Sequence, residues 1–236
     1  MKNKLLTLAF AILYICLQPC LGQGSDLLWK GVGGKEKWEQ TTYILFTVNG
    51  NGSKYIQDGR RFLIHRSSGR ARFEGRTEKG SNLVVLFNYK TGKLKKYYIN
   101  GEEISSSSEI QESFNKVQEQ FQRDNEFLFL STKTELHQAK SKVSSRIVNA
   151  EKLLSIPIQL PHNNISGELL FHPETGWIKQ ISESNGGTYL VNGYKDIGGG
   201  IYLPTVFKNV QNSNKSIIFP TVAAFTDMQE EKFTQL

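Results

Sequence analysis

The chain has 236 residues, of which 38% are hydrophobic and 11% aromatic, and its 29 basic and 22 acidic side chains give a formal net charge of +7. Both cysteines, Cys16 and Cys20, lie near the N-terminus, which excludes a disulfide-built fold for the rest of the chain. The basic residues are not gathered into one block, and their densest run, 90–96, lies among tyrosines; a nucleic-acid partner is not expected, because the N-terminal segment described next indicates export.

The N-terminal segment has the order of a secretory signal peptide. Lys2 and Lys4 precede an unbroken apolar run over 5–17, and small or polar residues follow it. The run is shorter than the roughly 20 residues needed to span a bilayer, so a membrane anchor is the weaker alternative. We therefore expect residues 1–23 to be a signal peptide and the protein to be exported, to the periplasm or the periplasmic face of the outer membrane.

The expected cut lies near Gly22 or Gln23. A lipid on Cys20 is an alternative, although Leu17-Gln18-Pro19 lacks the small residues that such sites place before the cysteine. Without the two lysines of the signal segment, the remaining chain carries a charge of +5. No internal linker or repeat is visible, and we expect residues 24–236 to form a single domain.

The first half of this domain alternates large and polar residues with period two. Turn signals such as Asn49-Gly50 and Asn100-Gly101 separate the alternating segments. The predicted strands are 43–48, 62–66, 71–75, 83–89 and 94–99. Their spacing of roughly ten residues is typical of an antiparallel meander.

A helical pattern interrupts the strands. Apolar residues at 110, 114, 117 and 121 form one stripe and predict a helix over 109–123, with Ser106 and Glu109 as a capping box. A second, shorter helix is predicted over 25–37, although glycines weaken its end. The polar stretch 131–145 has no pattern and is interpreted as a long loop or lid.

Strand signals return in the second half of the chain. The predicted strands are 147–158, 167–171, 177–181, 188–194, 201–207 and 216–225. The run Gly198-Gly199-Gly200 lacks the Lys-Ser/Thr pair and the helix start of a phosphate loop, so a bend or bulge in the sheet is the better interpretation.

Several short segments are similar to one family of exported Bacteroidetes proteins. They are Leu28-Trp29, Gly33-Gly34, Lys37-Trp38, 60–73, 85–88, 98–101, 175–178 and 197–205. That family resembles the periplasmic carriers of outer-membrane lipoproteins. The resemblance implies a mainly β (α+β) fold, in which a curved antiparallel sheet forms an open half barrel over one or two helices. After the main helix, the family tends to have an apolar run rich in Trp and Pro. This chain departs from that pattern, because its apolar segment 127–130 leads into the polar run 131–134.

The sequence carries few signals for catalysis or metal binding. The four histidines (His65, His137, His162 and His172) stand in separate segments, and no two have the spacing of metal ligands. No serine lies in a Gly-x-Ser-x-Gly motif, and the domain has no cysteine nucleophile. We therefore expect no enzymatic activity, no cofactor and no metal. An envelope hydrolase ranks as a distant third hypothesis, after the two that the next paragraph gives.

The apolar face of the sheet and helix suggests the function. Such a concave surface is either a filled core or a cavity for an acyl chain. The favoured hypothesis is a binding protein that holds a lipid or a lipoprotein acyl chain there. Its predicted lining is Phe46, Phe73, Leu86, Phe114, Phe121, Trp177 and Tyr189. The alternative is an envelope interaction or scaffolding domain with a filled core. Such a domain would bind its partner through an exposed strand edge or the basic hairpin 90–96. The basic residues also suit an anionic membrane surface as a partner.

Overall fold

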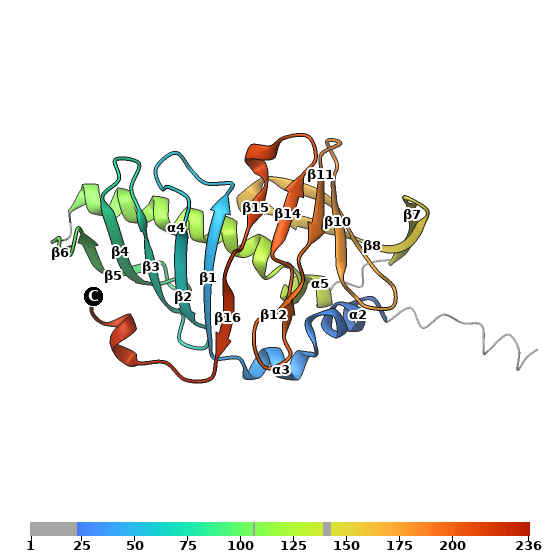
Figure 1. Cartoon of the computed structure of the whole chain (residues 1–236), viewed down its shortest axis with the longest axis horizontal. Helices are drawn as coiled ribbons and strands as arrows, with labels where there is room; N and C mark the ends of the chain where they lie inside the picture. Colours follow the sequence, from blue (N-terminus) through green and yellow to red (C-terminus); the bar gives the residue numbers. More distant parts are fainter. Residues whose placement is uncertain (1–22, 106, 139–142) are drawn as a thin grey trace, which may run out of the picture.

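The computed structural model describes residues 23–105, 107–138 and 143–236, and these build one long antiparallel sheet with a helix along one face (Figure 1). Fourteen strands of the described residues form this sheet in the order β6-β5-β4-β3-β2-β1-β15-β14-β11-β10-β9-β8-β7, with β16 also paired to β1. The sheet is curved and does not close on itself. The predicted mainly β, open half-barrel fold is therefore confirmed. Residues 1–22 of the predicted signal peptide lie outside the described residues.

The elements have the following bounds. The strands of the large sheet are β1 Tyr43–Gly50, β2 Arg60–His65, β3 Arg70–Arg76, β4 Asn82–Asn88, β5 Lys93–Ile99, β6 Glu102–Glu103, β7 Ser144–Val148, β8 Glu151–Leu160, β9 Ile165–Phe171, β10 Ile178–Glu183, β11 Thr188–Asn192, β14 Val206–Asn209, β15 Ile217–Ile218 and β16 Val222–Phe225. A separate pair joins β12 Lys195–Asp196 to β13 Tyr202–Leu203. The helices are α2 Gln23–Val32, α3 Lys35–Gln40, α4 Ser108–Leu128 and α5 Thr134–Gln138, with short 3-10 turns η1 Leu130–Thr132, η2 Pro161–Asn163, η3 Ser213–Lys215 and η4 Glu230–Phe233.

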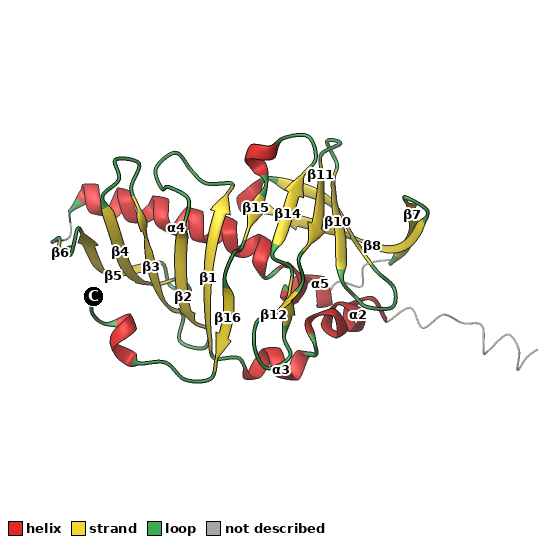
Figure 2. Ribbon diagram, in the orientation of Figure 1, coloured by secondary structure: helices red, strands yellow, loops and turns green. Residues whose placement is uncertain are grey.

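Helix α4 is the element that the apolar stripe predicted, and it continues to Leu128. Its N-cap is Ser107, whose side chain accepts a hydrogen bond from the backbone N–H of Ile110 at 3.3 Å. The predicted capping residue, Ser106, lies outside the described residues. Figure 2 shows the helix running along one face of the yellow sheet, behind strands of both halves. The first half is made of β1–β6, and the second half of β7–β11, β14 and β15.

Aromatic rings fill the space between α4 and the first half of the sheet. Phe46 lies opposite Phe62, and Phe62 lies opposite Phe73, so the three rings share one face of β1–β3. The ring of Phe121 on α4 lies 5.2 Å from that of Phe62, centroid to centroid. All four side chains are at most 1% exposed. Burial of such a side chain stabilises the fold by about 1.5–3 kcal/mol, so this layer holds α4 on the sheet.

The same helix also packs against the second half of the sheet. Near the end of α4, the ring of Phe127 lies 5.1 Å from Phe207 on β14 and 5.3 Å from Tyr189 on β11. Between the halves, Phe219 contacts both Phe46 and Phe207. One continuous hydrophobic core therefore runs under both halves of the sheet.

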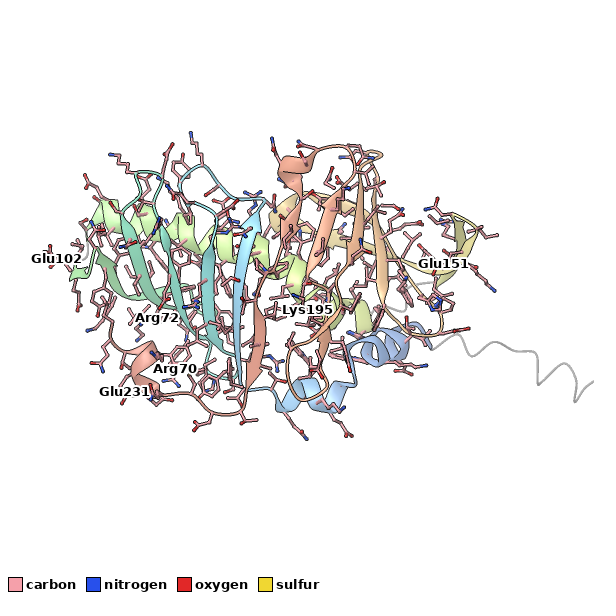
Figure 3. The ribbon with its side chains drawn as sticks, in the orientation of Figure 1. Arg70, Arg72, Glu102, Glu151, Lys195 and Glu231 are labelled. Atoms are coloured by element: carbon pink, nitrogen blue, oxygen red, sulfur yellow. The ribbon has the colours of Figure 1, made fainter. Side chains whose placement is uncertain are left out.

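The outer face of β1–β3 is covered by the last residues of the chain. Phe233 of η4 is 5% exposed and packs with Tyr43 and Leu63. Arg70 binds the carboxylate of Glu230 through both terminal nitrogens. Figure 3 shows Arg70 and Arg72 on β3 beside this segment. These contacts dock the C-terminal segment on the sheet.

Glycine geometry corrects the predicted helix over 25–37. The structure has two helices there, α2 and α3, separated at Gly33 and Gly34. These two residues have φ angles of 101° and 117°, a region that favours glycine and cannot continue a right-handed helix.

Other predicted segments differ from the structure as well, and the predicted strand 201–207 divides into β13 and β14, which belong to different sheets. The stretch 131–145 contains part of η1, α5 and the start of β7, while 139–142 lie outside the described residues. The predicted strand 147–158 is a hairpin, because Asn149 and Ala150 adopt positive φ angles and reverse the chain between β7 and β8. The predicted strand 216–225 divides into β15 and β16, which pair with different parts of β1.

Candidate functional site

The residues predicted to line a ligand cavity are placed in three environments. Four of them, Phe46, Phe73, Phe114 and Phe121, lie between α4 and the first half of the sheet and are at most 1% exposed. Phe121 contacts Phe46 at 6.4 Å between ring centroids, while Phe114 packs on Phe87 and Phe73 on Phe62. These four side chains therefore form packed core, as the filled-core alternative expects.

Leu86 lies on the other face of the sheet, so its predicted place on the concave face is wrong. It is paired between Arg72 on β3 and Lys96 on β5, whereas its neighbours Val85 and Phe87 point toward α4. The sequence 83–87 is apolar throughout and gives no sign of which alternate residues face inward. Which residues of β4 face α4 is therefore decided by the pairing of this strand with β3 and β5.

The last two predicted residues belong to the second half of the molecule. Tyr189 is buried beside Phe127, under the far end of α4. Trp177 precedes β10 and is 37% exposed, with its ring stacked on that of Tyr194 at 4.8 Å. Trp177 is thus a surface residue and does not share a cavity wall with the phenylalanines of the first half.

A hollow opens at the end of the half barrel where α4 begins, and we call it the α4–β5 hollow. It has a volume of about 460 Å³. It is lined by Tyr55, Ile56, Thr77, Glu78, Lys79, Ser81, Leu83, Tyr97, Ile99, Ser113, Lys116 and Val117. These residues come from the β1–β2 loop, the β3–β4 turn, the ends of β4 and β5, and α4.

The floor of the α4–β5 hollow is apolar. Ile56, Leu83, Tyr97 and Val117 are each at most 5% exposed and belong to the core cluster that continues under α4. A β-bridge between Ile56 and Thr77 holds the β1–β2 loop against the β3–β4 turn. The floor is therefore built from β4, β5, α4 and the β1–β2 loop, which the bridge holds in place.

The rim of the hollow is polar. Burial raises the pKa of the Tyr97 phenol, although its hydrogen bond with Ser113 and the nearby Lys116 oppose this. Tyr97 is therefore protonated at neutral pH and carries a hydroxyl donor. Lys116 forms an ion pair of 2.7 Å with Glu112, and this hydrogen bond raises the pKa of Lys116 and lowers that of Glu112.

A buried polar network lies beside the hollow and was not predicted. Arg60 and Asp124 are both inaccessible to solvent, and two guanidinium N–H groups donate to the carboxylate at 3.0 and 3.1 Å. Gln120 donates to the same carboxylate at 2.8 Å and accepts from the backbone N–H of Ser53. The network ties the β1–β2 loop to α4 and so fixes one wall of the hollow.

A larger hollow, of about 720 Å³, lies between α5, β8 and β9. Most of its lining residues are exposed, Pro157, Gln159 and Pro161 among them. It lacks the continuous buried floor of the α4–β5 hollow, which is therefore the better candidate site.

The histidines lie on different elements. His65 is on β2, His137 on α5, His162 on η2, and His172 directly follows β9. His137 stacks on Trp29 at 4.2 Å, and His172 lies 3.7 Å from a carboxylate oxygen of Glu151. Within the described residues, no group of three or more His, Cys, Asp or Glu side chains is arranged to hold a metal ion.

Comparison with solved structures gives a likeness of low similarity. No family model matches the chain, and no curated protein matches it. A crystal structure from Vibrio parahaemolyticus, described as an outer membrane lipoprotein-sorting protein domain, aligns with 84% of this chain and 93% of its own. The aligned sequences are 9% identical and the TM-score is 0.32, values too low for the likeness to bear on function. In the described part of the chain, no helix is both long and apolar enough to cross a membrane.

Proposed function

We propose that this chain is a non-enzymatic binding protein of the bacterial envelope that holds the apolar chain of a lipid or of a lipoprotein. The observation that supports this proposal is the α4–β5 hollow, which combines a buried apolar floor with a rim of hydroxyl and charged groups. Its volume of about 460 Å³ lies within the usual range of ligand pockets, about 300–1,000 Å³. Each buried CH₂ group of a ligand would contribute about 0.8 kcal/mol.

The proposed ligand position differs from the predicted lining. A chain placed among Phe46, Phe73 and Phe121 would have to displace rings that already contact one another. A chain lying over Leu83 and Val117 would cover the existing floor without moving those rings. The proposal therefore assigns the ligand to the end of the half barrel.

Binding is tested by displacement of a fluorescent apolar probe, N-phenyl-1-naphthylamine, with dodecyl ligands. Ser113→Phe adds a ring at the half-buried wall of the hollow and is expected to weaken binding at least tenfold. The matched control is Ser213→Phe on exposed η3, which should bind like the unaltered protein. Absence of any probe or dodecyl binding by the unaltered protein would refute the proposed function.

An envelope scaffolding domain is the second candidate, and the packed aromatic core favours it. Its interaction surface would be the basic hairpin 90–96 or the edge strand β7, where Ile147 is 80% exposed. Native mass spectrometry of the protein purified without detergent separates the two candidates. Co-purified lipid supports the binding protein, whereas a ligand-free protein that retains a macromolecular partner supports the scaffold.

Export belongs to the same proposal, since it rests on the first 23 residues of the sequence. N-terminal sequencing of the protein from a periplasmic fraction should give a start near Gly22 or Gln23. A protein that keeps Met1 and stays in the cytosol would contradict this part.

A further inference from the structure

The α4–β5 hollow carries positive charge at its rim, on both sides of the apolar floor. Lys79 and Lys116 line it, from the β3–β4 turn and from α4. A third lysine, Lys54, lies beside the lining residue Tyr55, with its ammonium nitrogen 5.2 Å from the ring centroid. The ammonium of Lys116 lies 4.2 Å from the same centroid. Two cations are therefore held at one aromatic ring.

These cations repel one another. Since both ammonium groups lie close to the Tyr55 ring, they are within about 10 Å of each other, which is the Debye length at 0.1 M salt. Glu112 compensates Lys116, and Glu78 is the acidic residue of the lining. Among the lining residues, the ammonium groups of Lys79 and Lys116 thus stand against the carboxylate of Glu78. Lys54 and Glu112 lie beside the lining residues Tyr55 and Lys116. A bound anion would reduce this repulsion and accept hydrogen bonds from the ammonium and hydroxyl groups.

We propose that the ligand of the α4–β5 hollow is a single-chain amphiphile with an anionic head, a carboxylate or a phosphate, held by Lys54, Lys79 and Lys116. The inference rests on the proposed function and adds the charge of the head group to it. The apolar chain lies on the floor of Leu83, Tyr97 and Val117, and the head group stays at the rim, where water also reaches it. The charge complementarity of the rim selects this occupant over a neutral lipid.

The test compares three dodecyl ligands by probe displacement: dodecanoate, dodecyl phosphate and the neutral 1-monododecanoylglycerol. The expected result is tighter binding of the two anionic ligands, by roughly tenfold, because each exposed charge pair adds a small gain in affinity. In the variant K54Q/K79Q/K116Q this preference should disappear while the glycerol ester binds as before.

The control variant K90Q/K93Q/K95Q removes the same charge at the opposite end of the β4–β5 hairpin and should keep the preference. Equal binding of charged and neutral ligands would overturn the inference and leave the proposed function standing. Failure of all three ligands to bind would refute the proposed function itself. Inorganic phosphate binding as tightly as dodecyl phosphate would mean an anion site without a chain site, and would overturn both.

Discussion

At the scale of single residues, the buried pair Arg60–Asp124 joins the sheet to α4. Asp124 follows Phe121 by three residues and therefore occupies the next position of the apolar stripe. A carboxylate there is tolerated because Arg60 donates two hydrogen bonds to it and Gln120 a third. The sequence gives no sign of this partnership, since the two charges are 64 positions apart.

Breaking this pair should destabilise the protein strongly. Asp124→Ala removes the buried carboxylate partner of Arg60 and leaves the exposed Asp58 as its remaining ion-pair partner. Loss of one partner of a buried pair costs about 3–5 kcal/mol. The free energy of unfolding in urea measures it. In the matched control, Glu39→Gln removes one partner of the exposed Lys35–Glu39 pair and should change that free energy by less than about 1 kcal/mol. Equal effects of the two substitutions would mean that Asp124 is not buried as described.

His65 gives the fold a dependence on pH. Burial and the neighbouring Arg70 lower its pKa, while Glu230 opposes them. The folded state therefore binds a proton less readily than the unfolded state, whose histidine pKa is about 6.5. Its contribution to stability is present above pH 6.5 and is lost as the pH falls toward the folded-state pKa. Urea midpoints at pH 7.5 and 5.5 should differ less in His65→Gln than in the unaltered protein, and identical differences would contradict this account.

At the scale of elements, period-two strands and the α4 stripe could be predicted, because each follows from local alternation. Helix breaks and strand parity could not be predicted in the same way. Gly33 and Gly34 divide α2 from α3 with positive φ angles, and a Cβ at Gly33 would meet the backbone of Gly200, a contact far apart in the sequence. The face of Leu86 depends on the register of β4 with β3 and β5, which a uniformly apolar segment does not encode.

The packing of α4 can be tested with one truncation. The ring of Phe121 contacts those of Phe46, Phe62, Phe87 and Tyr89. Phe121→Ala should therefore lower the free energy of unfolding by about 3–5 kcal/mol, the usual cost of such a cavity. Glu119→Ala, on the exposed side of the same helix, is the control and should have little effect. A small effect of Phe121→Ala would show that the stripe is not packed on the sheet.

At the scale of the whole molecule, α4 and the β1–β15 pairing connect the two halves of the sheet. Because one core runs under both halves, we expect residues 24–236 to unfold as one cooperative unit. Trp29, Trp38 and Trp177 report on the α2, α3 and β10 regions, whereas far-ultraviolet circular dichroism reports on the whole sheet. The two signals should give the same urea midpoint, and separated midpoints would indicate two domains.

The candidate site could be predicted only in part. Tyr97, Ile99 and Val117 belong to a predicted strand and a predicted helix, and their inward positions follow from those patterns. Ile56 and Lys79 lie in turns without periodicity, and only the bridge between Ile56 and Thr77 brings the loop to the floor. The predicted lining named the core under α4 instead, because apolar periodicity marks buried side chains and does not distinguish packing from a pocket.

The most direct test of the proposed function is methyl-group NMR of the unaltered protein titrated with dodecanoate. A ligand in the α4–β5 hollow should shift the methyl signals of Ile56, Leu83, Ile99 and Val117, and it should leave the exposed methyl groups of Ile147 and Ile218 unchanged. Saturable shifts confined to the four lining residues are the expected result. Unchanged signals at these residues, or shifts confined to other parts of the molecule, would contradict the assignment of the hollow as a ligand site.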